Sequence, residues 1–170
     1  MRVALAQIAP AWLQREATLE KITERLEEAA GQGAQLAVFG EALLPGYPFW
    51  PELTDGARFD DDVQKDLFAH YVANAVDLDA GHLDAVCRRA GELGIAVYLG
   101  VIERCAERGG CSLYACLVYI SPAGRIESAH RKLMQKLHPD RGGKVYPRSN
   151  SPATERRSAG RHRSGHRSAS

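Results

Sequence analysis

The first forty residues constrain the fold most, because short apolar strands alternate there with an amphipathic helix. Residues 2–9 alternate as a strand does and carry apolar side chains on both faces, which predicts a strand buried on both sides. A stripe at helical spacing, opposed by a charged face, then predicts a helix that ends at Gly31 or Gly33; the stripe holds Leu19, Ile22, Leu26 and Ala29. Residues 35–39 form a second apolar strand. This β-α-β order predicts an α/β fold.

Further elements follow the same logic. A loop rich in glycine, proline and aromatic residues covers 40–62, and helical patterns follow at 61–75 and 83–93, the second closed by Gly94. Apolar strands are expected at 95–102 and 113–121, joined by a hairpin, and a turn then leads into a strand over 125–130.

Composition excludes several function classes. The chain has 170 residues, of which 45% are apolar, and this suits one globular domain. Its net charge of +1 gives no general case for binding nucleic acid, and no segment is apolar enough to span a membrane, so we expect a soluble cytoplasmic protein. The four cysteines lack the spacing of a zinc site or disulfide framework, and we expect reduced thiols, no metal and no cofactor; they are Cys87, Cys105, Cys111 and Cys116.

The character of the chain changes after His138. Arginines alternate there with serine, glycine and histidine, and almost nothing apolar is available for burial. Such a segment does not offset its ordering entropy, so we expect a disordered basic tail over 135–170 behind an ordered domain over 1–134.

Two short motifs carry groups suited to catalysis. In FGEALLPGYP (39–48), Glu41 follows a buried strand, where α/β sheets hold their working groups, and partial burial would raise its pKa towards that of a useful general base. A carboxylate that only caps the loop is the alternative. In HRKL (130–133), Lys132 stands among basic neighbours and is suited to stabilise developing negative charge, or is simply part of a solvated strand end.

Residues 1 to about 134 resemble the nitrilase family of carbon–nitrogen hydrolases. The similar segments are MRVALAQIAP, FGEALLPGYPFW, IAVYLGVIER and SLYACLVYISPAGRIESAHRKL, in the family's order and spacing, and GEALLPGYP looks most like the nitrile-hydrolysing branch. The resemblance implies a four-layer α-β-β-α sandwich, truncated here, that self-associates and carries a Glu-Lys-Cys triad. Glu41 matches the general base and Lys132 the lysine that stabilises the tetrahedral intermediate. The family's cysteine thiolate attacks a nitrile carbon to form a thioimidate, from which water releases ammonia and the acid.

The sequence departs from the family pattern after the lysine. The family's nucleophilic cysteine lies downstream of that lysine, whereas every cysteine of this sequence precedes Lys132. The Pro-Thr that normally follows is replaced by Gln135 and Lys136. Cys87 and Cys116 have the spacing of core residues. We therefore expect the chain alone to be poorly soluble, with uncovered apolar sheet surface, and catalytically inactive.

A second resemblance lies where the composition of the chain changes, around His138. Residues 129–143 (AHRKLMQKLHPDRGG) are similar to the second helix and loop of a J-domain, whose His-Pro-Asp tripeptide would correspond to His138, Pro139 and Asp140. No apolar periodicity follows for the helix that such a domain packs against. One hypothesis is that residues 135–170 come from a join or a change of reading frame. The alternative is a genuine basic tail that makes non-specific phosphate contacts.

The sequence leaves three candidate functions open. The first is hydrolysis of a small nitrile or amide by a member of a homo-oligomeric family. The second is a catalytically inactive relative, such as a partner subunit within oligomers of its family, and the third is a co-chaperone fragment that acts through residues 138–140. Ammonia release, co-purification with a full-length nitrilase and stimulation of a chaperone ATPase distinguish them.

Overall fold

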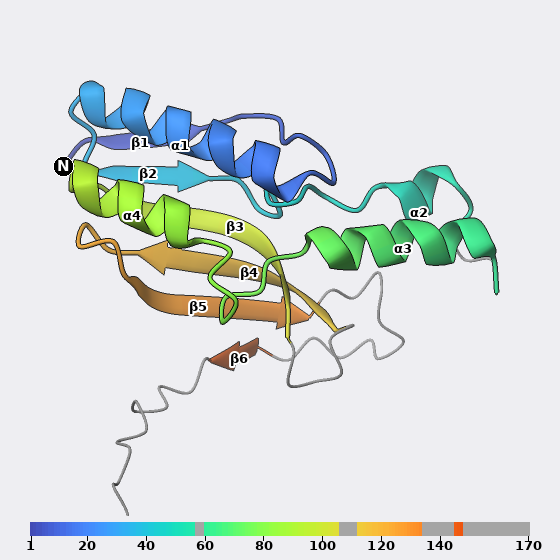
Figure 1. Cartoon of the computed structure of the whole chain (residues 1–170). Coiled ribbons are helices and arrows are strands. Elements are labelled where there is room, and N and C mark those ends of the chain that lie inside the picture. The colour runs from blue at the N-terminus through green and yellow to red at the C-terminus, as the bar shows by residue number, and fades with distance from the viewer. Residues whose placement is uncertain (57–59, 106–111, 134–144, 148–170) are drawn as a thin grey trace, which may run out of the picture.

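One mixed sheet forms the centre of the molecule in this computed structural model, which describes residues 1–56, 60–105, 112–133 and 145–147 (Figure 1). The strands lie in the order in which they occur along the chain. Pairing is parallel from the first to the third strand and antiparallel from the third onward. The strands are β1 (Val3–Ala6), β2 (Leu36–Phe39), β3 (Ala96–Arg104), β4 (Leu113–Ile120), β5 (Ile126–Leu133) and β6 (Val145–Pro147).

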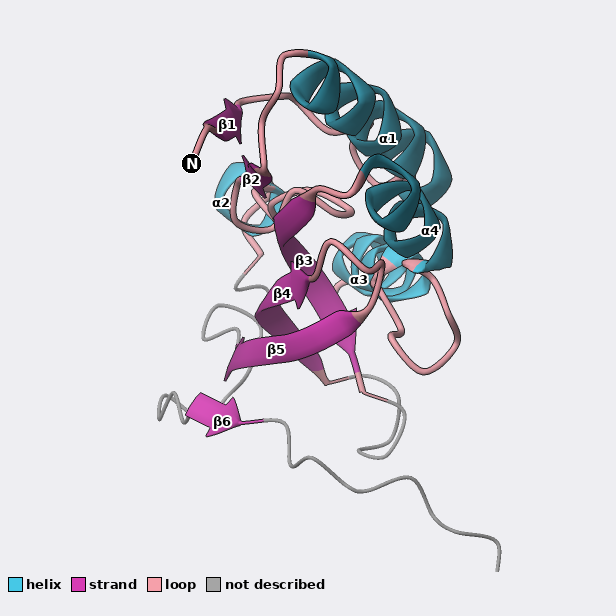
Figure 2. Ribbon diagram, turned by 90° about the vertical axis from the view of Figure 1, so that its left-hand side faces the viewer, coloured by secondary structure: helices cyan, strands magenta, loops and turns pink. Residues whose placement is uncertain are grey.

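Two helices, α1 (Arg15–Gly31) and α4 (Asp84–Leu93), cover one face of the sheet (Figure 2). The apolar stripe predicted for the first of them is buried in the main core, as are Val86 and Ala90 of α4. The helices also contact each other through an ion pair between Arg89 and Glu27. Gly94 ends α4 as expected. The helical periods in the sequence therefore identified the packed surfaces correctly.

The other face of the sheet is open over β1 and part of β4, whereas Ile102 and Leu113 on the same face are buried in a second apolar cluster. Successive side chains of a strand point to opposite faces, so Val3 and Leu5 point away from the α1 and α4 side. Leu5 is 76% exposed, Val3 is exposed as well, and Leu117 of β4 is 42% exposed. The prediction that residues 2–9 are buried on both sides is therefore wrong for this strand, because only its alanines pack against the core. We call this surface the open face.

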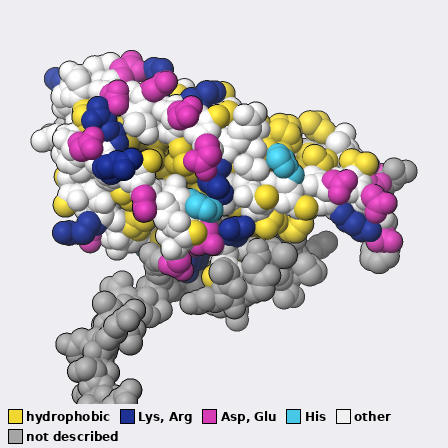
Figure 3. Space-filling view, in the orientation of Figure 1, with side chains coloured by type: hydrophobic (Ala, Val, Ile, Leu, Met, Phe, Trp, Pro, Cys, Tyr) yellow, Lys and Arg dark blue, Asp and Glu magenta, His cyan; other side chains and the backbone are white. Residues whose placement is uncertain are grey.

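A separate aromatic cluster stands at one end of the sheet. It is built around α2 (Trp50–Leu53) and α3 (Asp62–Asn74), which extend beyond the strands (Figure 1), and Asp61 caps α3 by accepting a hydrogen bond from the Gln64 N–H. Trp50 packs edge-on against Tyr71 with ring centroids 4.8 Å apart. Hydrophobic side chains also gather on the outer surface of this region (Figure 3). The sequence predicted α3 but not the one-turn α2.

The turn between β4 and β5 contacts α4 without any intervening side chain. A Cβ atom at Gly124 would lie 2.5 Å from the Cys87 carbonyl oxygen and 3.3 Å from the Gly91 Cα. Only glycine allows the turn to approach the helix this closely.

Strand β6 departs from the expected disorder after residue 134. It pairs with β5 from Lys132↔Val145 to His130↔Pro147. The outer edge of β5 offers unpaired backbone groups, and a short segment rich in β-forming residues satisfies some of them. The rest of the tail lies outside the described residues. Within them, no helix has the length and apolar character required to cross a membrane.

We predict that replacing Leu5 and Leu117 by lysine reduces self-association of the chain, because both substitutions remove apolar surface from the open face. Sedimentation and light scattering against concentration measure this. The free energy of unfolding should change by no more than about 0.5 kcal/mol per substitution, since neither side chain is in the core. Leu53→Lys, on the equally exposed α2, is the matched control. The same loss of self-association in this control would contradict a role for the open face.

Candidate active site

Glu41 lies on a turn that leaves the sheet at the end of β2 and returns to pair with β3. After β2 ends, residues 40–43 form the turn, and the backbone then rejoins β3 beside Val101. The Ile102 N–H donates a hydrogen bond of 2.7 Å to the Leu44 carbonyl oxygen. The turn is thus fixed at both ends. Its start follows β2, which pairs with β3, and its end pairs with β3 directly.

Gly100 determines on which side of the sheet this turn lies. A Cβ atom at Gly100 would stand 2.2 Å from the Gly40 carbonyl oxygen and 2.7 Å from the Glu41 Cα. Gly100 has the opposite orientation to Leu99 and Val101, which are in the core, so the turn crosses the open face. Glu41 itself is exposed. The expected partial burial of its carboxylate is therefore wrong in this structure.

Lys132 points to the same face. It is paired with Ala115, and Ala115 is paired with Ile102, which lies two residues from Gly100 on β3. The alternation of a strand puts all of these side chains on one side. β3 and β5 are two strand spacings apart, roughly 10 Å. Lys132 is exposed like Glu41, and the two residues predicted from the sequence thus share a face.

A buried ion pair that the sequence analysis missed lies on the opposite side of β5. Arg131 Nε and a terminal nitrogen donate to the two carboxylate oxygens of Glu103, at 2.6 and 2.5 Å. Glu103 is only 2% exposed. The carboxylate raises the pKa of Arg131 further above its usual value. Removing one partner of such a pair costs about 3–5 kcal/mol, because it leaves a charge buried without a partner.

The basic residues of the HRKL motif therefore do not form one basic surface. Its arginine points into the molecule and its lysine outward, because neighbouring residues of a strand face opposite sides. The signal for the ion pair was Glu103 itself, a carboxylate that follows seven uncharged residues of β3. A carboxylate in such a strand requires a cationic partner.

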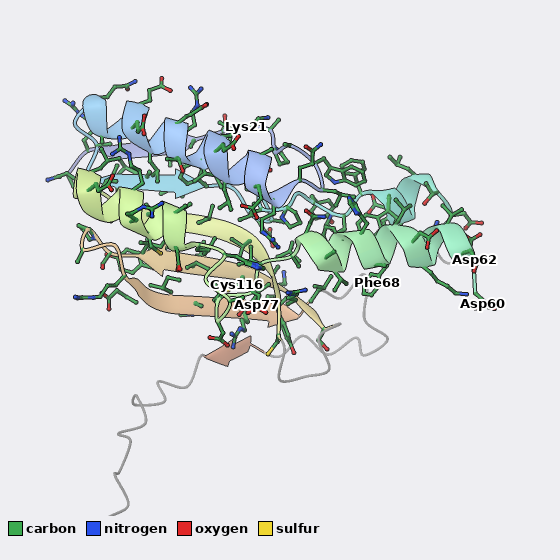
Figure 4. The ribbon with its side chains drawn as sticks, viewed as in Figure 1. Lys21, Asp60, Asp62, Phe68, Asp77 and Cys116 are labelled. Atoms are coloured by element: carbon green, nitrogen blue, oxygen red, sulfur yellow. The ribbon has the colours of Figure 1, made fainter. Side chains whose placement is uncertain are left out.

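The described cysteines do not supply a nucleophile to the open face. Cys116 is buried on β4 in the main core, on the α1 and α4 side (Figure 4). Cys87 is half-buried, and desolvation raises the pKa of its thiol to about 11, which keeps the thiolate scarce at neutral pH. Cys105 follows the end of β3, and Cys111 lies outside the described residues. The predicted core roles of Cys87 and Cys116 are confirmed.

The J-domain hypothesis loses part of its basis. Residues 129–133 belong to strand β5 and not to a helix, since their backbone pairs with β4 and β6. His138, Pro139 and Asp140 lie outside the described residues. Within the described part of the chain, no group of three or more histidine, cysteine, aspartate or glutamate side chains is arranged to hold a metal ion.

Several named proteins are similar in sequence to this chain over most of the chain's length. A protein named Nitrilase 2 from an unknown prokaryotic organism is 39% identical over 132 residues, which are 77% of this chain and 40% of that protein. An arylacetonitrilase of Aspergillus niger is 38% identical over 83% of this chain and 38% of its own length. An aliphatic nitrilase of Sinorhizobium fredii is 38% identical over 78% and 42%. The chain thus spans about two fifths of the length of these relatives.

Solved structures show the same fold at lower identity. The C. elegans NitFhit protein matches with a TM-score of 0.54 and 13% identity over 78% of this chain and 27% of that one. A glutamine-dependent NAD(+) synthetase from Cytophaga hutchinsonii matches with a TM-score of 0.51 and 18% identity over 79% and 19%. The pattern of the carbon-nitrogen hydrolase family matches residues 2–161. The fold is nitrilase-like, and the chain belongs to the carbon–nitrogen hydrolase family.

Gly100→Ala should destabilise the fold by about 1–3 kcal/mol, because the added methyl group collides with backbone that is tied down on both sides. Urea unfolding measures the change. Gly31→Ala is the matched control, since its Cβ meets nothing within 4 Å, and helix propensity makes it neutral or slightly stabilising. Equal stability of Gly100→Ala and the wild-type chain would mean that the Glu41 turn is not held against β3.

A second polar cluster fixes the connection between α3 and α4. The Asp77 carboxylate accepts hydrogen bonds from the N–H groups of Asp79 and Ala80, both at 3.1 Å, and Figure 4 marks Asp77 in this connection. His82 Nδ1 accepts the Asp77 N–H at 3.0 Å. Burial and then the nearby arginines, Arg15 and Arg104, lower the pKa of His82. The folded state therefore favours neutral His82.

This cluster predicts a pH-dependent stability. The stability that neutral His82 contributes is present above the unfolded pKa of 6.5 and is lost as the pH falls through the lower, folded pKa. His82→Asn keeps an acceptor near Nδ1 but does not titrate, so its unfolding free energy should fall less between pH 7 and pH 5. Urea unfolding at both pH values tests this, with His70→Asn on the exposed side of α3 as control. An identical pH dependence in His82→Asn and the wild-type chain would contradict the assignment.

Proposed function

We propose that Glu41 and Lys132 are the general base and the intermediate-stabilising lysine of a site that hydrolyses nitriles. The observation that carries the proposal is their shared position on the open face, which follows from the Gly100 contact and from the β4–β5 register. A base and a cation on one surface are what the hydrolysis of a carbon–nitrogen bond needs.

Each residue has a defined step in this reaction. Glu41 accepts the proton of a cysteine thiol, and the thiolate then attacks the nitrile carbon to form a thioimidate. Lys132 stabilises the negative charge that develops at the substrate during attack. Glu41 next activates water, which adds to the same carbon. The resulting adduct expels ammonia, which takes a proton from Glu41, and a thioester remains. A second water cleaves the C–S bond of this thioester and releases the thiol, so that one nitrile and two waters yield one carboxylic acid and one ammonia.

We propose that a second polypeptide supplies the nucleophile of this site. All four cysteines precede Lys132, and the two best-described ones are core residues on the far side of the sheet or on α4. Three of the matched relatives are named nitrilase or arylacetonitrilase, which favours nitriles over amides as the substrate class.

A non-catalytic member of the family is the second candidate function. It is favoured by the burial of Cys116 in the main core and by the raised pKa of the half-buried Cys87 thiol, which leave neither of them as a nucleophile on the open face. Such a chain would keep the exposed base and lysine without turnover, and act as a partner subunit for an intact relative. The co-chaperone function has no such observation in its favour, because residues 129–133 form a strand.

The test is complementation. The purified chain alone should release no ammonia from phenylacetonitrile or an aliphatic nitrile. We expect release when it is refolded with a second chain that holds the part of the prokaryotic Nitrilase 2 beyond the matched region. Glu41→Gln and Lys132→Met should each lower the rate of the mixture by about 100-fold or more, since general-base and electrostatic contributions have this size.

Exposed residues of α1 provide the matched controls. Glu24→Gln and Lys21→Met make the same chemical changes on the helix, away from the open face, and Figure 4 marks Lys21 there. They should leave the rate unchanged. Ammonia release by the chain alone, or by the mixture with Glu41→Gln, would contradict the proposed roles. A folded mixture without any activity would support the non-catalytic candidate.

A further inference from the structure

Arg131 and Lys132 are adjacent cations whose side chains point in opposite directions. Arg131 is paired with Cys116, a core residue, and binds Glu103 on the α1 and α4 side. Lys132 is exposed on the open face. A shift of β5 by one residue would exchange the faces to which these two side chains point, because the side-chain period of a strand is two.

Apolar packing does little to fix the register of β5. Of its described side chains only Ala129 is fully buried, and Ile126 is partly buried against the core. The register between β4 and β5 already shifts at Tyr119 and Ile120. Strands with few buried apolar side chains slip most readily, and an irregular position offers a site for the extra residue.

We propose that Glu103 is a positioning residue for Lys132. Its buried carboxylate selects Arg131 over the adjacent lysine and so fixes the register that presents Lys132 on the open face. The importance of this for catalysis rests on the function proposed above for Lys132. The selection of the register itself is independent of any activity.

The chemistry of the two cations explains the selection. A guanidinium group donates two parallel hydrogen bonds to one carboxylate, and both are present between Arg131 and Glu103. An ammonium group is a more strongly hydrated point charge and does not match the fork geometry. With Lys132 in the inner position, Glu103 would lose this bidentate contact, and Arg131 would stand on the open face.

A disulfide between paired strands measures the register directly. Leu117 and His130 face each other on the open face, and both kinds of antiparallel pair bring Cα atoms within the reach of a disulfide. In a Leu117→Cys, His130→Cys chain, oxidation should link the two positions in most folded molecules. Peptide mapping by mass spectrometry separates this link from those of the natural cysteines.

Three changes are then introduced into the cross-linking chain. Glu103→Gln removes the charge of the acceptor. Glu103→Met with Arg131→Met removes both charges and thus the penalty of an unpaired one. Arg131→Lys with Lys132→Arg exchanges the cations. We expect the yield of the 117–130 link per folded molecule to fall by about threefold or more in each, since the wrong register turns residue 130 to the other face.

Glu127→Gln is the matched control. Glu127 is an exposed residue of the same strand with its own hydrogen bonds to Ser121 and Arg125, and its loss should leave the yield unchanged. A pair that only stabilises the fold would lower the melting temperature without changing the yield per folded molecule. Wild-type yields in the Glu103→Met, Arg131→Met chain and in the exchanged chain would overturn the proposal. Because the readout is a cross-link, absence of ammonia release in the complementation test has no bearing on it.

Discussion

The edge of β3 is closed by three separate stretches of backbone, and the positions of the other elements depend on this. β2 pairs with its first residues, Leu44 with its middle and Val76 with its last part. Between these contacts the chain leaves the sheet twice. The first excursion is the Glu41 turn, and the second contains α2, α3 and the aromatic cluster. The candidate base and the aromatic cluster are thus both insertions anchored on one strand, which accounts for their fixed relation to the open face.

Periodicity predicted the elements whose partners lie close in the sequence. The helices α1 and α4 and the strands β1 to β5 were predicted because each buries a regular stripe or face against its neighbours, whereas β6 was not predicted. Periodicity does not tell whether both faces of an apolar strand are covered, as Leu5 shows. The position of Glu41 was predictable from its strand and loop, whereas its exposure was not, because the surface that would cover it is not part of the local pattern.

The candidate site also depends on contacts that no short motif reveals. Arg131 and Glu103 are 28 residues apart and meet only because β3, β4 and β5 are antiparallel neighbours. Seen locally, residues 130–132 are three basic side chains. The sheet separates them by face, so that one neutralises a buried carboxylate and the next remains available on the surface. The motif gives the residue types, and the register gives each of them its environment.

Gly91 and Gly124 are distant in the sequence but in contact, so a substitution at one position affects the packing at the other. At Gly124 the β4–β5 turn lies against backbone atoms of α4, so a side chain added there meets no flexible neighbour that could move aside. A larger residue at Gly124 has to push the helix away from the sheet whatever stands at 91, because the Cys87 carbonyl is also in its way. Among homologous sequences a larger residue at this position should therefore occur only where the helix is displaced as well.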